Sequence, residues 1–212
     1  MEYNNFNMTN ALDMQSVCIT LPPGFIADKP HPLIIALHWG IDIYRSIHRD
    51  FMTGFVEPAF NGLGAILAAP RRTGSDWANA ANDTALLNLA EKLQSQYSVN
   101  PGQILLTGYS MGGIGSWMLG SRHQDIFAGI LPISAQPPAQ AIGIPWKIPL
   151  YVIHSQQDEF FPFHEVQAII DNLQRLGVDI TWRPLAFGTH FDTGSFITAV
   201  RASHPWIRSL WE

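Results

Sequence analysis

In this 212-residue chain, the stretch Ile104-Leu105-Leu106-Thr107-Gly108-Tyr109-Ser110-Met111-Gly112 has the pattern of a buried strand that leads through a sharp turn into a helix. It joins a short apolar run to a G-x-S-x-G pattern that occurs once, and a glycine-rich helix start follows. A strand, a sharp turn and a helix in this order lift the hydroxyl of Ser110 clear of the backbone. The chain on either side of the turn then passes so closely that Cβ atoms at Gly108 and Gly112 would collide. We therefore predict that Ser110 is a nucleophile at the end of a buried strand.

Two other interpretations of this stretch are a tight turn without chemistry and a phosphate-binding glycine loop. Gly108 and Gly113 have the spacing of the two P-loop glycines, but Ile114-Gly115 stands where Lys-Ser/Thr should follow. The position directly after a buried strand favours the nucleophile. A glycine inside a helix costs about 1 kcal/mol relative to alanine. Gly113 and Gly115 therefore predict close packing of this helix against the sheet.

The rest of the chain alternates short apolar runs with amphipathic stretches. Apolar runs without polar alternation are typical of strands buried on both faces of a parallel sheet. Their alternation with helices predicts an α/β fold, with a mostly parallel central sheet and helices on both faces. No repeat or linker divides the sequence, so we expect one domain over residues 1–212. The expected strands are Ser16–Leu21, Leu33–Leu37, Ala65–Ala69, Ile104–Thr107, Ile130–Ile133, Leu150–Ile153 and Val178–Trp182, and the expected helices are Thr84–Tyr97, Gly112–Arg122, Phe163–Leu176 and Gly194–Ser203.

Two residues are expected at helix ends. Asp83 precedes the helix predicted from Thr84 and is a plausible N-cap, because a carboxylate there accepts hydrogen bonds from the first backbone N–H groups. Gly177 follows the helix predicted to end at Leu176, in the position that favours a glycine after a helix C-terminus.

The composition excludes several classes of protein. Hydrophobic residues make up 47% of the chain and charged residues 14%, which argues against disorder. The formal net charge of −5, with no basic run interleaved with aromatic residues, argues against nucleic acid as a partner. No apolar run approaches the roughly 20 residues that span a bilayer. The N-terminal stretch lacks the basic and apolar regions of a secretory signal, so we expect a cytoplasmic protein. Cys18, the single cysteine, is expected to be a buried thiol.

An acid and a base are expected in the loops that follow later strands. Parallel sheets carry their chemistry just beyond the carboxyl ends of the strands, and the order after such a serine is acid, then histidine. Asp158 follows the strand predicted over Leu150–Ile153 and is favoured by position over its neighbour Glu159. His190 follows the last predicted strand and is the predicted base. His204 is its rival, but its place near the final helix suits packing better.

We expect no metal. The other histidines do not group with acidic residues at metal-ligand spacing, and they have no comparable support as catalysts. They are His31, His48, His123, His154 and His164.

The predicted strand Leu33–Leu37 ends in His38-Trp39-Gly40. A tetrahedral intermediate needs two N–H donors, one from the residue after the nucleophile and one from this early loop. Met111 would supply the first, and Trp39 or Gly40 the second. The Trp39 side chain is equally consistent with a wall of the acyl pocket and with a core aromatic.

Taken together, these residues resemble the phospholipase/carboxylesterase group of the α/β-hydrolase superfamily, which includes acyl-protein thioesterases. The resemblance implies an α/β-hydrolase fold, cofactor-free cleavage of esters or thioesters, and a triad of Ser110, Asp158 and His190. The chain departs from the group at Trp39, where a glycine is usual, and at Ser155, where a glycine is frequent. A relative of dienelactone hydrolase is expected to carry cysteine where this chain has Ser110. The motifs behind the resemblance are Leu37–Gly40, Gly108–Gly113, His154–Pro162 and Gly188–His190.

The expected function is hydrolysis of small or medium acyl esters, or thioesters, through an acyl-serine intermediate. A serine peptidase on the same fold and a non-catalytic ligand-binding homologue are the alternatives. The segment Gln136–Lys147 is too short for a helical cap, so we expect an open groove. Arg71-Arg72 and Asp76-Trp77 would line the alcohol side of that groove or belong to a solvated loop, and we favour the solvated loop.

Overall fold

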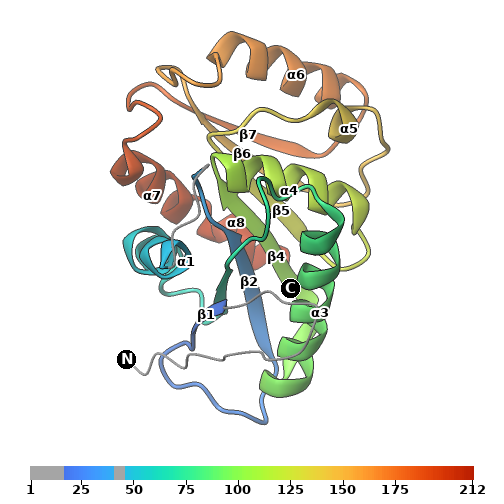
Figure 1. The fold of residues 1–212 in the computed structure, drawn as a ribbon. Helices are drawn as coiled ribbons and strands as arrows, with labels where there is room; N and C mark the ends of the chain where they lie inside the picture. The colour runs from blue at the N-terminus through green and yellow to red at the C-terminus, as the bar shows by residue number, and fades with distance from the viewer. Residues whose placement is uncertain (1–16, 41–45) are drawn as a thin grey trace.

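The computed structural model describes residues 17–40 and 46–212. Within these residues, seven strands form one sheet in the order β1-β3-β2-β4-β5-β6-β7, twisted through the centre of the molecule (Figure 1). Only the pair β1 and β3 is antiparallel among the neighbouring strands. The predicted mostly parallel sheet is confirmed. The strands are β1 Val17–Thr20, β2 His31–Leu37, β3 Ile66–Pro70, β4 Val99–Tyr109, β5 Gly129–Ile133, β6 Leu150–Ser155 and β7 Ile180–Leu185.

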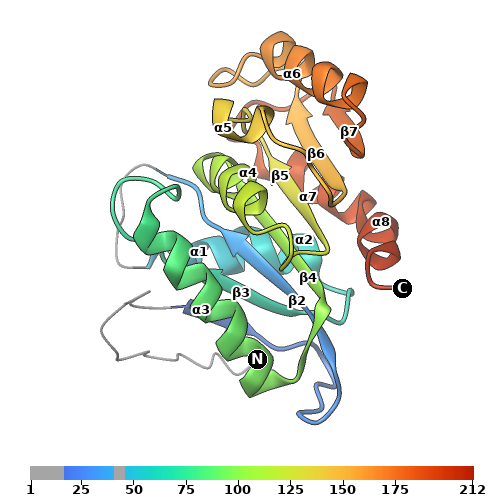
Figure 2. The same ribbon diagram turned by 90° about the vertical axis from the view of Figure 1, so that its right-hand side faces the viewer.

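Helices cover both faces of the sheet, as Figure 2 shows most clearly. Helices α3, α4 and α6 bury their apolar side chains against one face, and α1, η1, α2, α7 and α8 pack against the other. Successive residues of a strand point to opposite faces, so Leu33 and Ile35 of β2 join the first cluster and Ile34 the second. The helical segments are α1 Ile47–Phe51, η1 Met52–Val56 (a π-helix), α2 Glu57–Phe60, α3 Ala80–Tyr97, α4 Met111–Arg122, α5 Ala139–Ile142, α6 Phe163–Arg175, α7 Thr193–Ala202 and α8 His204–Ser209.

Each predicted strand has a counterpart, with shifted ends; Ser16 lies outside the described residues. The helices over residues 47–60 were not predicted. Apolar side chains such as Phe51 and Phe55 are buried there at helical spacing, but Gly54 and Pro58 lower the helix propensity of the stretch. Helix α8 was also missed, and it follows α7 almost without a break.

The prediction for Asp83 is wrong. Helix α3 begins at Ala80, and the side chain of Asn79 caps it by accepting the Asn82 N–H at 2.9 Å. Asp83 lies in the first turn instead, where its carboxylate accepts from Arg122 Nη1 at 2.5 Å. A carboxylate in the first turn still interacts favourably with the helix dipole.

The prediction for Gly177 is confirmed. Helix α6 ends at Arg175 with Leu176 as the C-cap, and Gly177 adopts the left-handed conformation with φ of +85°. The N–H of Gly177 donates to the Gln174 carbonyl at 2.9 Å, and the N–H of Val178 to the Leu173 carbonyl at 3.1 Å. These are the two hydrogen bonds of a Schellman motif.

Cys18 is buried in β1, as expected. Burial, together with the nearby Glu57 carboxylate, raises the pKa of the thiol to about 11. A thiol with so high a pKa is a poor nucleophile, so Cys18 is a packing residue.

The glycines of α4 let this helix lie directly on the sheet. A Cβ at Gly113 would come within 2.6 Å of the Ala135 Cβ, and one at Gly115 within 2.5 Å of the Trp77 Cβ. Such distances are too short for carbon atoms. The predicted close packing against the sheet is confirmed at Gly113, where a Cβ would also lie 2.7 Å from the Ile133 carbonyl of β5, whereas Gly115 packs most closely against Trp77 in the loop after β3. The helix that begins at the Ser110 turn is thereby fixed relative to β5.

Replacing one of these glycines tests the packing. We expect Gly115→Ala to lower the free energy of unfolding by about 1–3 kcal/mol, because the buried Trp77 has no room to move. The matched control is Gly54→Ala in η1, where no atom lies within 4 Å of the added methyl group. That variant should be unchanged or up to about 1 kcal/mol more stable. Urea unfolding followed by tryptophan fluorescence measures both; equal stability of the two variants would contradict the packing argument.

Candidate active site

Ser110 occupies the sharp turn between β4 and α4. Its φ of 56° and ψ of −118° are unusual for a residue with a side chain, as in a nucleophile elbow. A Cβ at Gly108 would overlap the Gly112 carbonyl, and a Cβ at Gly112 would overlap the carbonyl of Leu37 in β2. The predicted collision is confirmed. Both glycines are therefore needed for the turn that presents the serine hydroxyl.

Ser110, His190 and Asp158 lie in one hydrogen-bonded line. Ser110 Oγ is 2.8 Å from His190 Nε2, and His190 Nδ1 is 2.9 Å from Asp158 Oδ2. With a proton on Nδ1 donated to the carboxylate, Nε2 accepts the serine proton. The structure thus brings together three residues from three strand-end loops, after β4, β6 and β7.

Asp158 is buried, yet its carboxylate is fully hydrogen-bonded. Oδ1 accepts the backbone N–H groups of Phe160 and Phe161, each at 2.9 Å. Burial alone would raise the pKa of the carboxyl, but the hydrogen bonds from His190, Ser134 and the backbone outweigh it and bring the pKa to about 2. Asp158 is therefore ionised at neutral pH and stabilises a positive charge on the imidazole.

Glu159, the competitor for the acid position, has a different contact. Its Oε2 accepts the backbone N–H of His190 at 2.8 Å, whereas the imidazole of His190 pairs with Asp158. The preference for Asp158 agrees with the geometry. Glu159 instead ties the loop after β6 to the loop that carries the histidine.

Ser134 also belongs to the site, and the sequence analysis did not assign it a role. It directly follows β5 and is fully buried, with φ of 49°. Its Oγ donates to Asp158 Oδ2 at 2.5 Å and lies 3.0 Å from His190 Nδ1. Because Ser134 lies on the Nδ1 side of the ring and is buried, the geometry favours Ser110, on the Nε2 side, as the nucleophile. The available signal was the position of Ser134 at the carboxyl end of a predicted strand.

Two further hydrogen bonds hold the backbone of the histidine loop, one at Gly188 and one at His190. The hydroxyl of Tyr109 donates to the carbonyl of His190, and the hydroxyl of Ser155 donates to the carbonyl of Gly188. Ser155 is one of the two departures from the resembling group. Its hydroxyl here holds the histidine loop, a contact that a glycine could not make.

The early loop after β2 is held through three successive backbone carbonyls. The His38 carbonyl accepts a hydrogen bond from Trp77 Nε1 at 3.1 Å. The Trp39 carbonyl accepts one from His38 Nδ1 at 2.7 Å. The Gly40 carbonyl accepts one from Arg72 Nη2 at 3.0 Å. In a trans peptide the carbonyl and the following N–H point in opposite directions. The N–H groups of Trp39 and Gly40 therefore point away from Trp77 and His38. The roles of Trp39, Gly40 and Met111 as oxyanion donors stay predictions.

The side chain of Trp39 is partly buried and packs against the core. Its ring meets Phe51 edge-on at 4.7 Å between centroids and Tyr109 at 5.8 Å. These contacts agree with a packing role, and a wall of the acyl pocket formed by its exposed part stays a prediction.

The expectation of a solvated loop after β3 is wrong for two of its four residues. Arg72 and Trp77 are each 1% exposed and hold the early loop from behind, while Asp76 is exposed. A positively charged side chain is buried here because carbonyl oxygens surround it, including that of Gly74 at 2.5 Å from Nη1.

His38 and His48 are buried as neutral imidazoles behind the early loop. Burial lowers the pKa of each from 6.5 to about 4. His38 is well paired: besides donating to Trp39, it accepts the Arg72 N–H at Nε2, at 3.2 Å. Within the described part of the chain, neither ring nitrogen of His48 has a hydrogen-bond partner.

The remaining histidines do not enter the site as catalysts. His204 Nε2 bonds the carbonyl of Ala59 at 2.9 Å, in agreement with a packing role. His154 is buried under the acid loop, bonds the Phe161 carbonyl at 2.9 Å, and lies 3.9 Å from Asp158 Oδ2. Among residues 17–40 and 46–212, no three His, Cys, Asp or Glu side chains gather as metal ligands. In the same residues, no helix has the length and apolar character needed to cross a membrane.

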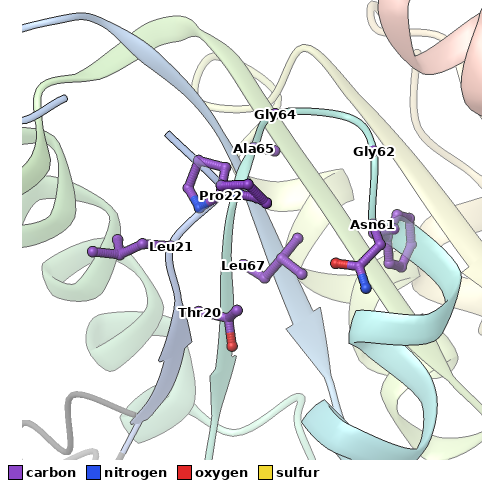
Figure 3. A pocket seen from close by; sticks show the side chains of 10 residues that line it. Thr20, Leu21, Pro22, Asn61, Gly62, Gly64, Ala65 and Leu67 are labelled. Atoms are coloured by element: carbon purple, nitrogen blue, oxygen red, sulfur yellow. The ribbon is translucent and has the colours of Figure 1, made fainter. Parts of the chain in front are cut away.

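A small pocket lies away from the triad, between the end of β1 and the end of α2 (Figure 3). Thr20, Leu67 and Asn61 are among its lining residues. Leu67 is near the start of β3, whereas Ser110 follows the carboxyl end of β4. The pocket therefore lies at the opposite ends of the parallel strands from Ser110. It contributes nothing to the triad.

A serine, histidine and aspartate at the carboxyl ends of three strands of this sheet define an α/β hydrolase. The solved structure of S-formylglutathione hydrolase (FrmB) from Staphylococcus aureus has the same fold, with a TM-score of 0.76 at 17% identity, over 97% of this chain and 98% of that chain. A thermostable esterase gives a TM-score of 0.74 at 20% identity, over 98% of this chain and 62% of that one.

The chain belongs to the dienelactone hydrolase family, whose model matches residues 70–184, more than half of its length. The expectation that a relative of dienelactone hydrolase carries cysteine at this position is therefore wrong. The matched residues include Ser110, which stands where the cysteine was expected. A cysteine at this position is therefore not required for a match to the family.

Two curated relatives are named as a feruloyl esterase and as a depolymerase. Feruloyl esterase C of Emericella nidulans is 27% identical over 132 residues, 60% of this chain and 49% of that protein. The poly(3-hydroxybutyrate) depolymerase of Ralstonia pickettii is 40% identical over 90 residues, 35% of this chain and 18% of that protein. The chain thus spans about half the length of the first of these relatives.

Ser134 provides a test of the acid's environment. We expect Ser134→Gly to lower kcat about 10-fold, because Asp158 loses a hydrogen-bond donor, while glycine relieves the positive φ and preserves the fold. Asp158→Asn, which removes the charge itself, sets the upper limit at about 10⁴-fold. Initial rates on a soluble ester and thermal melting measure both. An unchanged kcat in a stable Ser134→Gly protein would remove Ser134 from the site.

The buried histidines predict a loss of stability in mild acid. Their pKa values are lower in the folded state than in the unfolded state, so the unfolded chain binds more protons between pH 6.5 and 4. The free energy of unfolding should therefore fall as the pH falls through this window, by about 1–2 kcal/mol per histidine from pH 7 to 5. The charges that face His48 are those of Arg49, Arg71 and Asp50.

His48→Leu isolates the contribution of one histidine. Between pH 7 and 5 this variant should lose about 1–2 kcal/mol less than wild type in urea unfolding, since one buried titrating group is gone. The same pH dependence in both proteins would show that His48 does not titrate in this window.

Proposed function

We propose that this chain is a serine esterase that cleaves carboxylic esters through an acyl-Ser110 intermediate. The observation that carries the proposal is the imidazole of His190, placed 2.8 Å from Ser110 Oγ and 2.9 Å from the Asp158 carboxylate. A nucleophile, a base and a group that orients the base are the complete set for acyl transfer.

The reaction has two halves. In the first, Ser110 Oγ attacks the ester carbonyl carbon while His190 Nε2 takes its proton, and the same nitrogen then returns the proton to the leaving alcohol as the C–O bond breaks. In the second, water attacks the acyl carbon while His190 Nε2 takes a proton from it, and the same nitrogen returns the proton to Ser110 Oγ as the acyl–Oγ bond breaks and the carboxylic acid leaves. Asp158 stays ionised throughout and stabilises the imidazolium, as its low pKa allows.

Backbone N–H groups would stabilise the oxyanion in both halves. Met111 at the start of α4 is the first proposed donor, and Trp39 or Gly40 is the second. The hydrogen bonds to the carbonyls of Trp39 and Gly40 support this role, because a loop held before the reaction needs no rearrangement during it.

The substrate is proposed to be a small or medium acyl ester. The segment between β5 and β6 contains only the four-residue helix α5, which supports an open site. Thioesters are a second proposed class, supported by the resemblance of Gly108–Gly113 and His154–Pro162 to the phospholipase/carboxylesterase group. The name of feruloyl esterase C adds feruloyl esters to the candidates.

The test combines active-site labelling with turnover. A fluorophosphonate probe should label Ser110, located by peptide mass mapping, and p-nitrophenyl esters of increasing acyl length should be hydrolysed. Ser110→Ala should abolish labelling and turnover with the fold intact. Ser95→Ala, an exposed serine on α3, is the matched control and should keep both.

Other outcomes would contradict the proposal. Folded protein with neither adduct nor turnover would favour a non-catalytic binding protein. Faster cleavage of aminoacyl p-nitroanilides than of the corresponding esters would favour a serine peptidase.

A further inference from the structure

Two exposed phenylalanines stand beside the proposed base. Phe160, in the loop after β6, is 57% exposed, and Phe191, in the loop after β7, is 69% exposed. A single exposed apolar side chain is ordinary, but two adjoining rings at a reaction centre form an apolar surface that water wets poorly.

Both rings contact His190 and each other. The ring of His190 lies 4.8 Å from that of Phe160 and 5.5 Å from that of Phe191, and the two phenylalanine rings meet edge-on at 5.4 Å. Phe161 lies 5.6 Å from the same imidazole and packs against the core below. We call Phe160 and Phe191 the aromatic wall.

The proton transfer fixes which part of the substrate reaches this wall. His190 Nε2 must come within hydrogen-bond distance of the leaving oxygen to protonate it. The first carbons of the alcohol therefore lie beside the imidazole, whereas the acyl group lies toward the oxyanion donors. A group extending from the leaving oxygen meets the rings that flank His190.

We propose that Phe160 and Phe191 form a subsite for an apolar, preferably aromatic, alcohol portion of the ester. The inference rests on the proposed esterase function and specifies its leaving-group side. Apolar contact and edge-to-face ring packing supply the attraction, and both act without a charged partner.

The experiment varies the alcohol and holds the acyl group constant. Benzyl acetate and methyl acetate are compared by pH-stat, since both have primary alcohols as leaving groups and produce the same acetyl-enzyme. The value of kcat/KM includes the step in which the alcohol leaves, so the benzyl-to-methyl ratio reports the subsite. We expect wild type to prefer benzyl acetate, and each of Phe160→Ala and Phe191→Ala to lower that ratio by about 3- to 10-fold.

Two controls separate binding from a general structural effect. Phe187→Ala removes a phenylalanine that is 77% exposed and has no ring contact with His190 among the described residues, so its ratio should equal that of wild type. The ratio between methyl butyrate and methyl acetate, which varies only the acyl group, should be unchanged in the wall variants. A misplaced His190 would instead lower kcat/KM for every ester equally.

The partitioning of the acetyl-enzyme gives a second readout. Added benzyl alcohol should compete with water for acetyl-Ser110, forming benzyl acetate and free serine, more effectively in wild type than in Phe160→Ala. Hydrolysis without any benzyl preference, or a preference that survives both wall variants, would overturn the subsite and leave the esterase proposal intact. Absence of turnover on every ester would overturn both.

Discussion

The close approach of three chain segments at the Ser110 turn is the constraint on which the rest of the structure depends. Gly112 touches the end of β2, and Gly108 touches Gly112 across the turn, so no side chain fits at either position. This contact fixes the nucleophile relative to the neighbouring strand. The loop that follows β2 begins at the same point. The positions of the proposed oxyanion donors and of the serine are therefore fixed relative to each other.

Around that turn, the site is assembled from loops that hold one another. Glu159 accepts the backbone N–H of His190, while Tyr109 and Ser155 bind carbonyls in the same loop. Each contact joins different strand ends, so the imidazole is positioned by the sheet as a whole. This arrangement explains how an exposed loop can carry a histidine that is only 4% exposed.

The polar groups buried behind the site differ in whether they are hydrogen-bonded. Arg72 donates to the Gly40 carbonyl, and His38 donates to the Trp39 carbonyl and accepts the Arg72 backbone N–H. Among the described residues, His48 has no hydrogen-bond partner, and burying it in this way costs stability. Both histidines make this region sensitive to acid, because burial lowers the pKa of each.

The sequence by itself determined the nucleophile turn, the α/β class and the order of serine, acid and histidine, because each depends on local pattern and chain order. Tertiary structure decided what depends on strand order in the sheet. Ser134 reaches Asp158 because β5 lies beside β6, and neither residue carries a local mark of that contact. Arg72 is buried for the same reason: β3 is adjacent to β2, which brings a charged residue beneath a loop more than thirty residues earlier.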